Sequence, residues 1–132
     1  MKAHITAILA ALSPTIDAYY VDVPDGATYP YVLLWGSPGG AGVESSIAAD
    51  SDMSDLLGVT VVDIEPTNVL SAVQTVRGIL NGLRPAVTGR QVLLTFEYSS
   101  TVQPDKTVKL PETGSFPFYA VDRYRLIDTP AD

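Results

Sequence analysis

The chain has 132 residues, of which 46% are hydrophobic and 17% charged, and this predicts one folded domain over residues 1–132 with a substantial core. The chain has no cysteine, which excludes disulfides, thiolate catalysis and cysteine–zinc sites. The net charge is −7, and only eight Lys and Arg are spread along the chain. This argues against tight binding to nucleic-acid phosphates. It does not exclude DNA passing nearby, because an acidic surface repels DNA and keeps it from binding.

The N-terminal segment is predicted to be an amphipathic helix over residues 2–12. Its apolar side chains follow helical spacing, at Ile5, Ile8, Leu9 and Leu12. A signal peptide is the weaker interpretation, because His4 and Thr6 interrupt the apolar stretch. Pro14 ends the helix, and no apolar run in the chain reaches the length of a membrane span.

Two strands are predicted next, over residues 19–23 and 31–35, and the turn-forming residues 24–26 lie between them. We expect these strands to form a hairpin or to lie near each other. Residues 36–55 are rich in glycine and small polar side chains, which predicts a long mobile loop that becomes ordered during assembly. The residues assigned to this assembly loop include Gly39, Gly40, Gly42, Glu44, Asp50, Asp52 and Asp55.

The next strand is predicted over residues 56–64, where apolar side chains occupy both faces. A strand that is apolar on both faces is covered on both, by helices or by another subunit. A second helix follows, with a candidate N-cap at Thr67 and a C-terminal signal at residues 81–82. Its apolar stripe consists of Val69, Val73, Val76, Leu80 and Leu83.

Two further strands complete the domain, over residues 91–98 and 118–128. The first alternates, and its apolar side chains are predicted to share one face at Val92, Leu94, Phe96 and Tyr98. In the second, Arg123 and Arg125 share a face and Asp122 lies on the other. The order of elements is therefore α-β-β-loop-β-α-β-loop-β, which predicts an α+β fold.

Three features that could indicate catalysis or ligand binding lack the residues that such chemistry needs. His4 is the only histidine and has no serine or cysteine partner at a recognisable spacing. The acidic cluster at residues 50–55 lacks the glycine and the glutamate that a calcium loop needs at its sixth and twelfth positions. The glycine run at residues 36–42 is not followed by the lysine of a phosphate-binding loop. We predict no catalytic, metal-binding or cofactor-binding residues, and no enzyme activity.

Residues 110–114 match the sorting signal that sortases cleave. A genuine signal precedes a membrane span and a basic tail, whereas residues 116–132 are too few and too polar to span a bilayer. We interpret the match as a turn before the last strand.

Large aromatic side chains and arginines are typical of surfaces that contact other chains. For Arg123 and Arg125, an exposed strand edge with weak salt bridges and a contact between subunits are both open interpretations. The candidate interface residues are Tyr31, Trp35, Val59, Val61, Tyr119, Arg123, Tyr124 and Arg125.

The opening helix and the segments at residues 29–36, 58–64, 68–80 and 119–127 resemble the tail terminator proteins of long-tailed, siphovirus-type bacteriophages. The chain resembles in particular the versions from phages of actinobacteria. The resemblance implies a mixed, mostly antiparallel sheet of about five strands, with two helices packed on one face. It carries no catalytic residues over to this chain.

The resemblance also implies a place in the virion, at the head-proximal end of the tail. There a ring, expected to be a hexamer, caps the tail tube, stops its polymerisation and joins the tail to the head–neck complex. The implied partners are further copies of this chain, the major tail tube protein and the head–tail stopper or neck protein. DNA would pass through the lumen without specific binding, and candidate lumen residues are Glu44, Asp50, Asp52 and Asp55.

Two alternatives remain open at this point. A head–tail stopper or adaptor protein of the neck has a similar size, and the position of the gene before the tube gene would separate it from a terminator. A small ligand-binding α+β domain is the other alternative, which a monomer with a deep pocket would favour.

Overall fold

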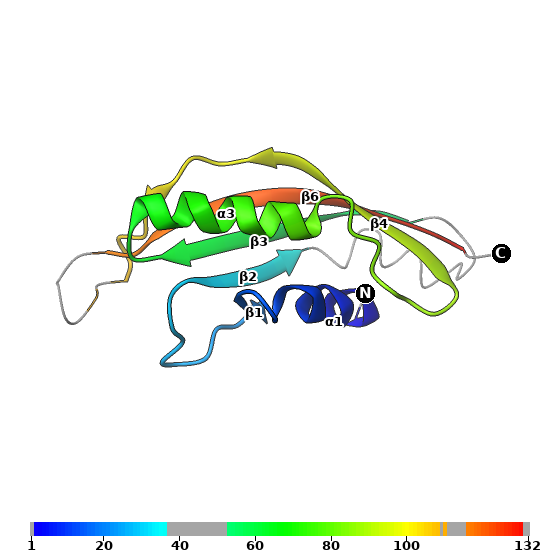
Figure 1. The fold of residues 1–132 in the computed structure, drawn as a ribbon, viewed down its shortest axis with the longest axis horizontal. Coiled ribbons are helices and arrows are strands. Elements are labelled where there is room, and N and C mark those ends of the chain that lie inside the picture. Colours follow the sequence, from blue (N-terminus) through cyan, green and yellow to red (C-terminus); the bar gives the residue numbers. More distant parts are fainter. Residues whose placement is uncertain (1, 37–52, 109, 111–115, 131–132) are drawn as a thin grey trace.

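The structure, a computed structural model, describes residues 2–36, 53–108, 110 and 116–130. Two helices and six strands make up the described part of the chain (Figure 1). In chain order they are α1 (Lys2–Leu12), β1 (Asp17–Tyr20), β2 (Tyr31–Gly36), β3 (Met53–Asp63), α3 (Pro66–Leu80), β4 (Arg90–Ser99), β5 (Gln103–Pro104) and β6 (Phe118–Pro130).

The strands form one mixed sheet in the order β1-β2-β3-β6-β4, and the short β5 also pairs with β6. β1 and β2 are parallel, and every other pair is antiparallel. β6 is central: it pairs with β3 from Phe118 to Asp128 and with β4 on its other side. The sheet confirms the predicted α+β fold, and it shows that Arg123 and Arg125 do not lie on an edge strand.

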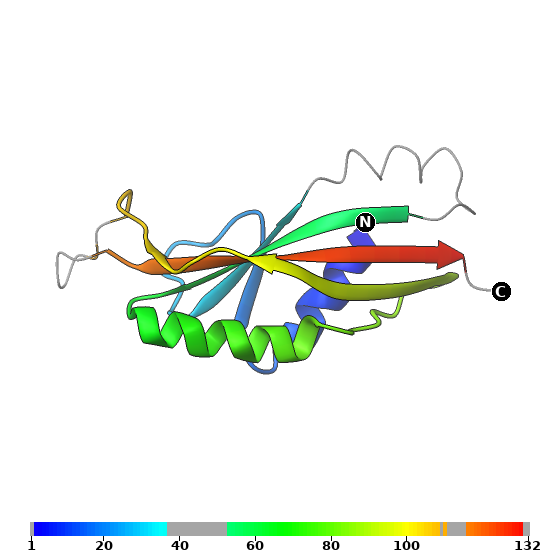
Figure 2. The ribbon, with the colours of Figure 1, turned by 90° about the horizontal axis from the view of Figure 1, so that it is seen from above.

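Both helices contribute to one core on one face of the sheet. Figure 2 shows α3 extended along the central strands, while α1 crosses at an angle. α1 buries Ile5, Ile8 and Leu12, and α3 buries Val69, Val73, Val76 and Leu80, as the helical spacing predicted. The sheet side chains in the same core are Val32, Leu34, Leu57, Val59, Val61, Val92, Leu94, Ala120, Tyr124 and Leu126.

The first two strands differ from the prediction in start and direction. β1 begins at Asp17 rather than at residue 19, and it runs parallel to β2, so the two do not form a hairpin; they are neighbours in the sheet, which confirms the other predicted arrangement. Residues 21–30 carry the chain back to the start of β2. The reversal begins at Val21, which has a positive φ of 68°, a conformation that branched side chains rarely adopt.

Three local predictions about element ends and strand faces were wrong. α3 begins at Pro66 after Glu65, so Thr67 is not the N-cap. Asp55 lies in β3 and not in the assembly loop, because β3 already begins at Met53. A β-bulge between Phe96 and Tyr98 places Tyr98 opposite Arg123, on the face away from the core.

The predicted end of the second helix is confirmed: Asn81 is the C-cap of α3, and Gly82 follows with a positive φ of 83°. The assembly-loop residues Gly39, Gly40, Gly42, Glu44, Asp50 and Asp52 lie outside the described residues. Within the described residues, neither helix has the length and apolar character needed to cross a membrane.

Candidate functional site

The face of the sheet opposite the two helices is the candidate site, and we call it the uncovered face. Neither described helix packs against it, because the buried side chains of both helices join the core on the other side. Strand alternation and the observed register place the following side chains on it: Tyr31, Leu33, Trp35, Leu56, Thr60, Val62, Leu93, Tyr98, Tyr119, Val121, Arg123, Arg125 and Ile127. Most are half-buried, and Tyr98 and Ile127 are 56% and 40% exposed.

Trp35 is held flat against the centre of this face. A Cβ atom at position 58 would overlap the indole ring, so the ring occupies the space that Gly58 leaves open. The indole Nε1 donates a hydrogen bond of 2.8 Å to Thr60 Oγ1. The guanidinium carbon of Arg123 lies 4.2 Å from the ring centroid, a cation–π distance. Three neighbours on β3 and β6 therefore fix one orientation of the tryptophan.

Arg125 continues the row of arginines along β6. Its Nε donates a hydrogen bond of 2.8 Å to Glu97 Oε1, and its Nη1 lies 3.3 Å from Ser54 Oγ. The Arg125 and Glu97 side chains are each 37% exposed, so solvent screens this ion pair. Arg125 thus remains accessible to another molecule.

Tyrosines gather at the other end of the face, around the start of β2. The Tyr31 ring lies 6.2 Å from that of Tyr19, edge to face, and 5.6 Å from that of Tyr29. Burial raises the pKa of Tyr31 above its usual value, and the charges of Tyr29 and Asp105 add to the increase. Tyr31 is therefore a neutral hydroxyl donor at neutral pH, with an apolar ring for packing.

Of the predicted interface residues, the structure brings Tyr31, Trp35, Tyr119, Arg123 and Arg125 together on the uncovered face. The other three predicted residues lie on the helix side of β3 and β6. Val59 and Tyr124 have no exposed surface and Val61 has 1%, so α1 and α3 close these side chains to any partner. Their assignment to an interface was wrong, because odd and even residues of a strand point to opposite faces.

Sequence reasoning missed Tyr98, Gly58 and Thr60. A bulge that turns Tyr98 over has no clear signal in the sequence. Gly58, in contrast, lies in the middle of a mostly apolar strand, and such a glycine often marks a close approach by another group. A tryptophan on a neighbouring strand is a natural candidate for that group, so this part of the site could have been predicted from the sequence.

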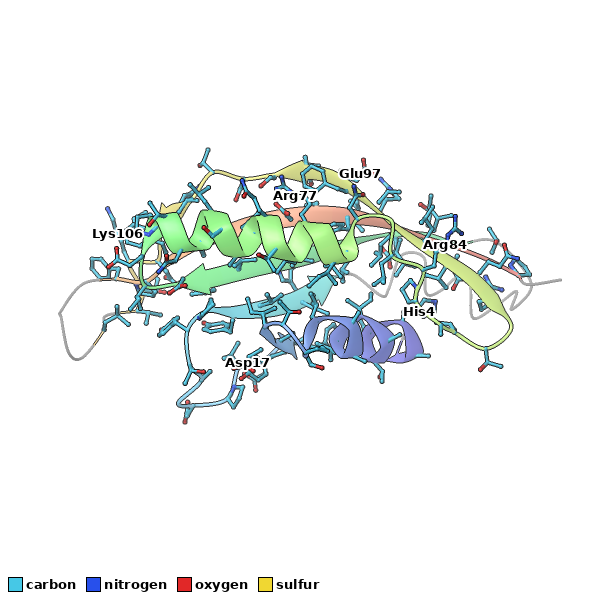
Figure 3. All side chains as sticks on the ribbon, viewed as in Figure 1. His4, Asp17, Arg77, Arg84, Glu97 and Lys106 are labelled. Atoms are coloured by element: carbon cyan, nitrogen blue, oxygen red, sulfur yellow. The ribbon has the colours of Figure 1, made fainter. Side chains whose placement is uncertain are left out.

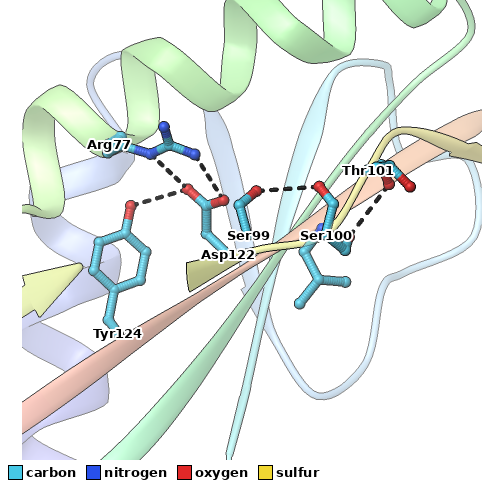
Figure 4. A network of polar contacts seen from close by, with 7 residues as sticks. Arg77, Ser99, Ser100, Thr101, Asp122 and Tyr124 are labelled. Atoms are coloured by element: carbon cyan, nitrogen blue, oxygen red, sulfur yellow. Dashed lines mark hydrogen bonds and ion pairs between the residues drawn. The ribbon is translucent and has the colours of Figure 1, made fainter. Parts of the chain in front are cut away.

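Arg77, Asp122 and Tyr124 form a polar network on the opposite, helix-covered face (Figure 4). Arg77 Nε and Nη2 bind the two Asp122 carboxylate oxygens at 3.1 and 3.0 Å, and the Tyr124 hydroxyl lies 3.4 Å from Asp122 Oδ2. The hydrogen bond to Asp122 raises the pKa of Arg77. Burial, and then the charge of Asp122, raises the pKa of Tyr124.

His4 lies in a second buried cluster, near the N-terminus of α1 (Figure 3). Its Nε2 lies 2.5 Å from Asp128 Oδ2, and Arg90 Nε donates to Asp128 Oδ1 at 2.5 Å. His4 is 6% exposed, and its buried Nδ1 has no hydrogen-bond partner among the residues that the structure describes. The cluster joins α1 to the ends of β4 and β6, and it is closed to a substrate.

The described part of the chain holds no group of three or more metal-binding side chains placed to share an ion. No protein-family model matches the chain, and a search of curated proteins finds no match. The resemblance to tail terminators therefore stays a prediction. What the structure itself displays is a face of aromatic, aliphatic and arginine side chains, a composition that is typical of protein interfaces.

Proposed function

We propose that this protein is a structural subunit that binds other protein chains through the uncovered face. A sheet that is apolar on both faces, with the two described helices on only one, carries this proposal. Trp35 and Arg123 add to it, because aromatic and arginine side chains held in one conformation lose little entropy on binding.

The specific assembly we propose is the tail terminator ring of a long-tailed phage, as the sequence resemblance implies. In this role the protein forms a hexamer that caps the head-proximal end of the tail tube, stops tube polymerisation and joins the tail to the head–neck complex. Its partners are then the major tail tube protein and the head–tail stopper.

A ring of identical subunits needs two different surfaces that fit each other. The uncovered face supplies one of them. Leu70, near the start of α3, is 54% exposed and offers an apolar side chain on the helix side, away from that face. Contact between the uncovered face of one copy and the start of α3 in the next would be heterologous, as ring closure requires.

The charge distribution is compatible with DNA passing through such a ring. The net charge is −7, and two of the arginines on the helix side, Arg77 and Arg90, are engaged by Asp122 and Asp128. These two guanidinium groups are thus offset by local carboxylates and attract phosphates weakly. A lumen built in this way repels a polyanion and does not hold it.

The test is a tube-length assay with the major tail tube protein of the same phage. Polymerising tube protein is mixed with this protein, and tube lengths are measured by electron microscopy. The wild type should limit tube length. Arg123→Glu should lose this effect, because it reverses the charge over Trp35 on the uncovered face.

Arg84→Glu is the matched control, since it makes the same change at an exposed position after α3 and outside the uncovered face. This variant should keep full activity. Unlimited tube growth with the wild type would contradict the terminator role and favour a stopper or adaptor of the neck. Equal behaviour of the two variants would contradict the role of the uncovered face.

A further inference from the structure

A groove lies between the end of α1, the residues before β2 and the first turns of α3, and its first cleft reaches Tyr29 at the edge of the uncovered face. It consists of two adjoining clefts with volumes of about 340 and 430 Å³. Thr15, Ile16 and Pro30 line both clefts, so the two are continuous. The first cleft extends to Asp17, which is labelled in Figure 3 below the end of α1, and the second extends to Asp63 and α3.

Asp63 is the unusual residue of this groove, because it is only 5% exposed and yet lines the second cleft. Its Oδ1 accepts a hydrogen bond of 2.6 Å from the backbone N–H of Ile64. No Lys, Arg or His among the described residues forms an ion pair with it. Buried carboxylates are normally paired, so this one has the capacity to bind a cation from outside.

Two hydroxyl groups of the second cleft, those of Ser71 and Thr75, are also arranged as acceptors, and Thr15 and Asn68 add further polar groups to its lining. The Ser71 hydroxyl donates to the Thr67 carbonyl at 3.3 Å, and the Thr75 hydroxyl donates to the Ser71 carbonyl at 3.1 Å. Since each proton is already used within α3, each hydroxyl oxygen has only lone pairs left to offer. Ile16 and Ala72 add apolar surface beside these acceptors.

We propose that this groove binds a lysine or arginine side chain presented by a partner protein. The cationic group pairs with Asp63, the hydroxyl oxygens of Ser71 and Thr75 accept its remaining N–H groups, and its alkyl stem packs on Ile16 and Ala72. The residues lining the two clefts include Asp17 and Asp63 and no basic side chain. The net charge of −7 favours a basic partner in the same way.

The experiment is a titration of the ¹⁵N-labelled protein, followed by NMR, with three capped amino acids. N-acetyl-arginine methylamide and N-acetyl-lysine methylamide carry the cation, and N-acetyl-norleucine methylamide has an apolar stem without it. At least one basic probe should cause saturable shifts of the Ile64 and Ala72 amide signals. The norleucine probe should cause none that saturate.

Asp63→Asn is the test variant, since an asparagine Oδ1 can still accept the Ile64 N–H while the charge is lost. It should weaken binding by about tenfold or more, the effect expected when a hydrogen bond to a charged group is lost. Asp55→Asn is the control: it removes the same charge from the same strand, where Asp55 Oδ1 accepts the Leu56 N–H at 2.9 Å, outside the groove. This variant should bind as the wild type does.

Three outcomes would overturn the inference: no saturable shift with either basic probe, equal binding of the norleucine probe, or unchanged binding by Asp63→Asn. None of these results bears on the tube-length assay, because the inference does not rest on the ring. The absence of binding in the groove and the absence of an interface on the uncovered face would therefore be separate findings.

Discussion

The two faces of the sheet are built from alternate residues of the same strands, yet they carry different chemistry. The helix-covered face is mostly aliphatic and largely buried, with Tyr124 in its core, and its carboxylates Asp122 and Asp128 are each paired with an arginine. The uncovered face holds aromatic rings and arginines that are half-buried, with Trp35 beneath Arg123 at its centre. The first arrangement stabilises the fold, while the second leaves side chains ordered and accessible. The contrast implies that stability and recognition are separated by face and can be changed independently.

The sharpest test of this separation is a pair of neighbouring leucines on β2. Leu34 is fully buried beneath the helices, and Leu33 is half-buried on the uncovered face. Leu34→Ala should lower the free energy of unfolding by about 2–5 kcal/mol through lost burial and a cavity. Leu33→Ala should cost about 1 kcal/mol or less, since its surroundings can adjust. Urea unfolding of both variants measures the difference, and equal losses would show that the faces do not differ in this way.

Gly58→Ala tests the close contact at the centre of the uncovered face. The added methyl group overlaps the Trp35 ring, so the ring must move, at a cost of about 1–3 kcal/mol. Trp35 is the only tryptophan, and its fluorescence therefore reports the displacement directly. Gly78→Ala is the control, because a methyl group there on α3 meets nothing within 4 Å and should stabilise the helix by up to about 1 kcal/mol. An unchanged emission spectrum in Gly58→Ala would contradict the contact.

Tyr124 gives a pH-dependent test of the helix-covered face. Burial raises its pKa above the ordinary tyrosine value of about 10, so the folded protein keeps this proton where the unfolded chain loses it. The stability from this effect is complete below about pH 10 and is lost as the pH rises above it. Above about pH 10, the unfolding free energy of the wild type should fall more steeply than that of Tyr124→Phe, by up to about 1.4 kcal/mol per pH unit. Parallel curves for the two proteins, measured by urea unfolding, would refute this.

The smallest expected effect concerns the ion pair between Arg125 and Glu97. Both side chains are 37% exposed, so a double-mutant cycle with alanine should give a coupling of about 0.2–1 kcal/mol. The same cycle for Arg77 and Asp122 should give a larger coupling, since the Asp122 side chain is 2% exposed. A stronger coupling between Arg125 and Glu97 than between Arg77 and Asp122 would contradict the expected difference between the two faces.

Much of the fold could be predicted because periodic patterns are local. The apolar stripes predicted both helices, and the alternation of side chains along a strand predicted that Arg123 and Asp122 lie on opposite faces. The pairing of strands is not local, so neither the parallel direction of β1 nor the central place of β6 could be derived from these segments. The N-terminus of α3 was missed because no side chain caps it, and Pro66 begins the helix instead.

The candidate site could be predicted only in part, for a related reason. Apolar residues on both faces of β3 predicted a second contact surface, but not which face the helices would cover. Val59 and Val61 were therefore assigned to an interface, although they lie in the core. The ordered position of Trp35 depends on Gly58 and Arg123, which come from two other strands, and their register is fixed only in the folded protein.

A cryo-EM reconstruction of the virion neck would show directly whether the uncovered face is an interface in a ring. We predict that this chain forms a six-fold ring at the head-proximal end of the tail. In that ring, the face carrying Trp35 and Arg123 is buried against a neighbouring chain. A face turned to solvent while the chain makes its contacts elsewhere, or the absence of the chain from the upper end of the tail, would contradict the proposed ring.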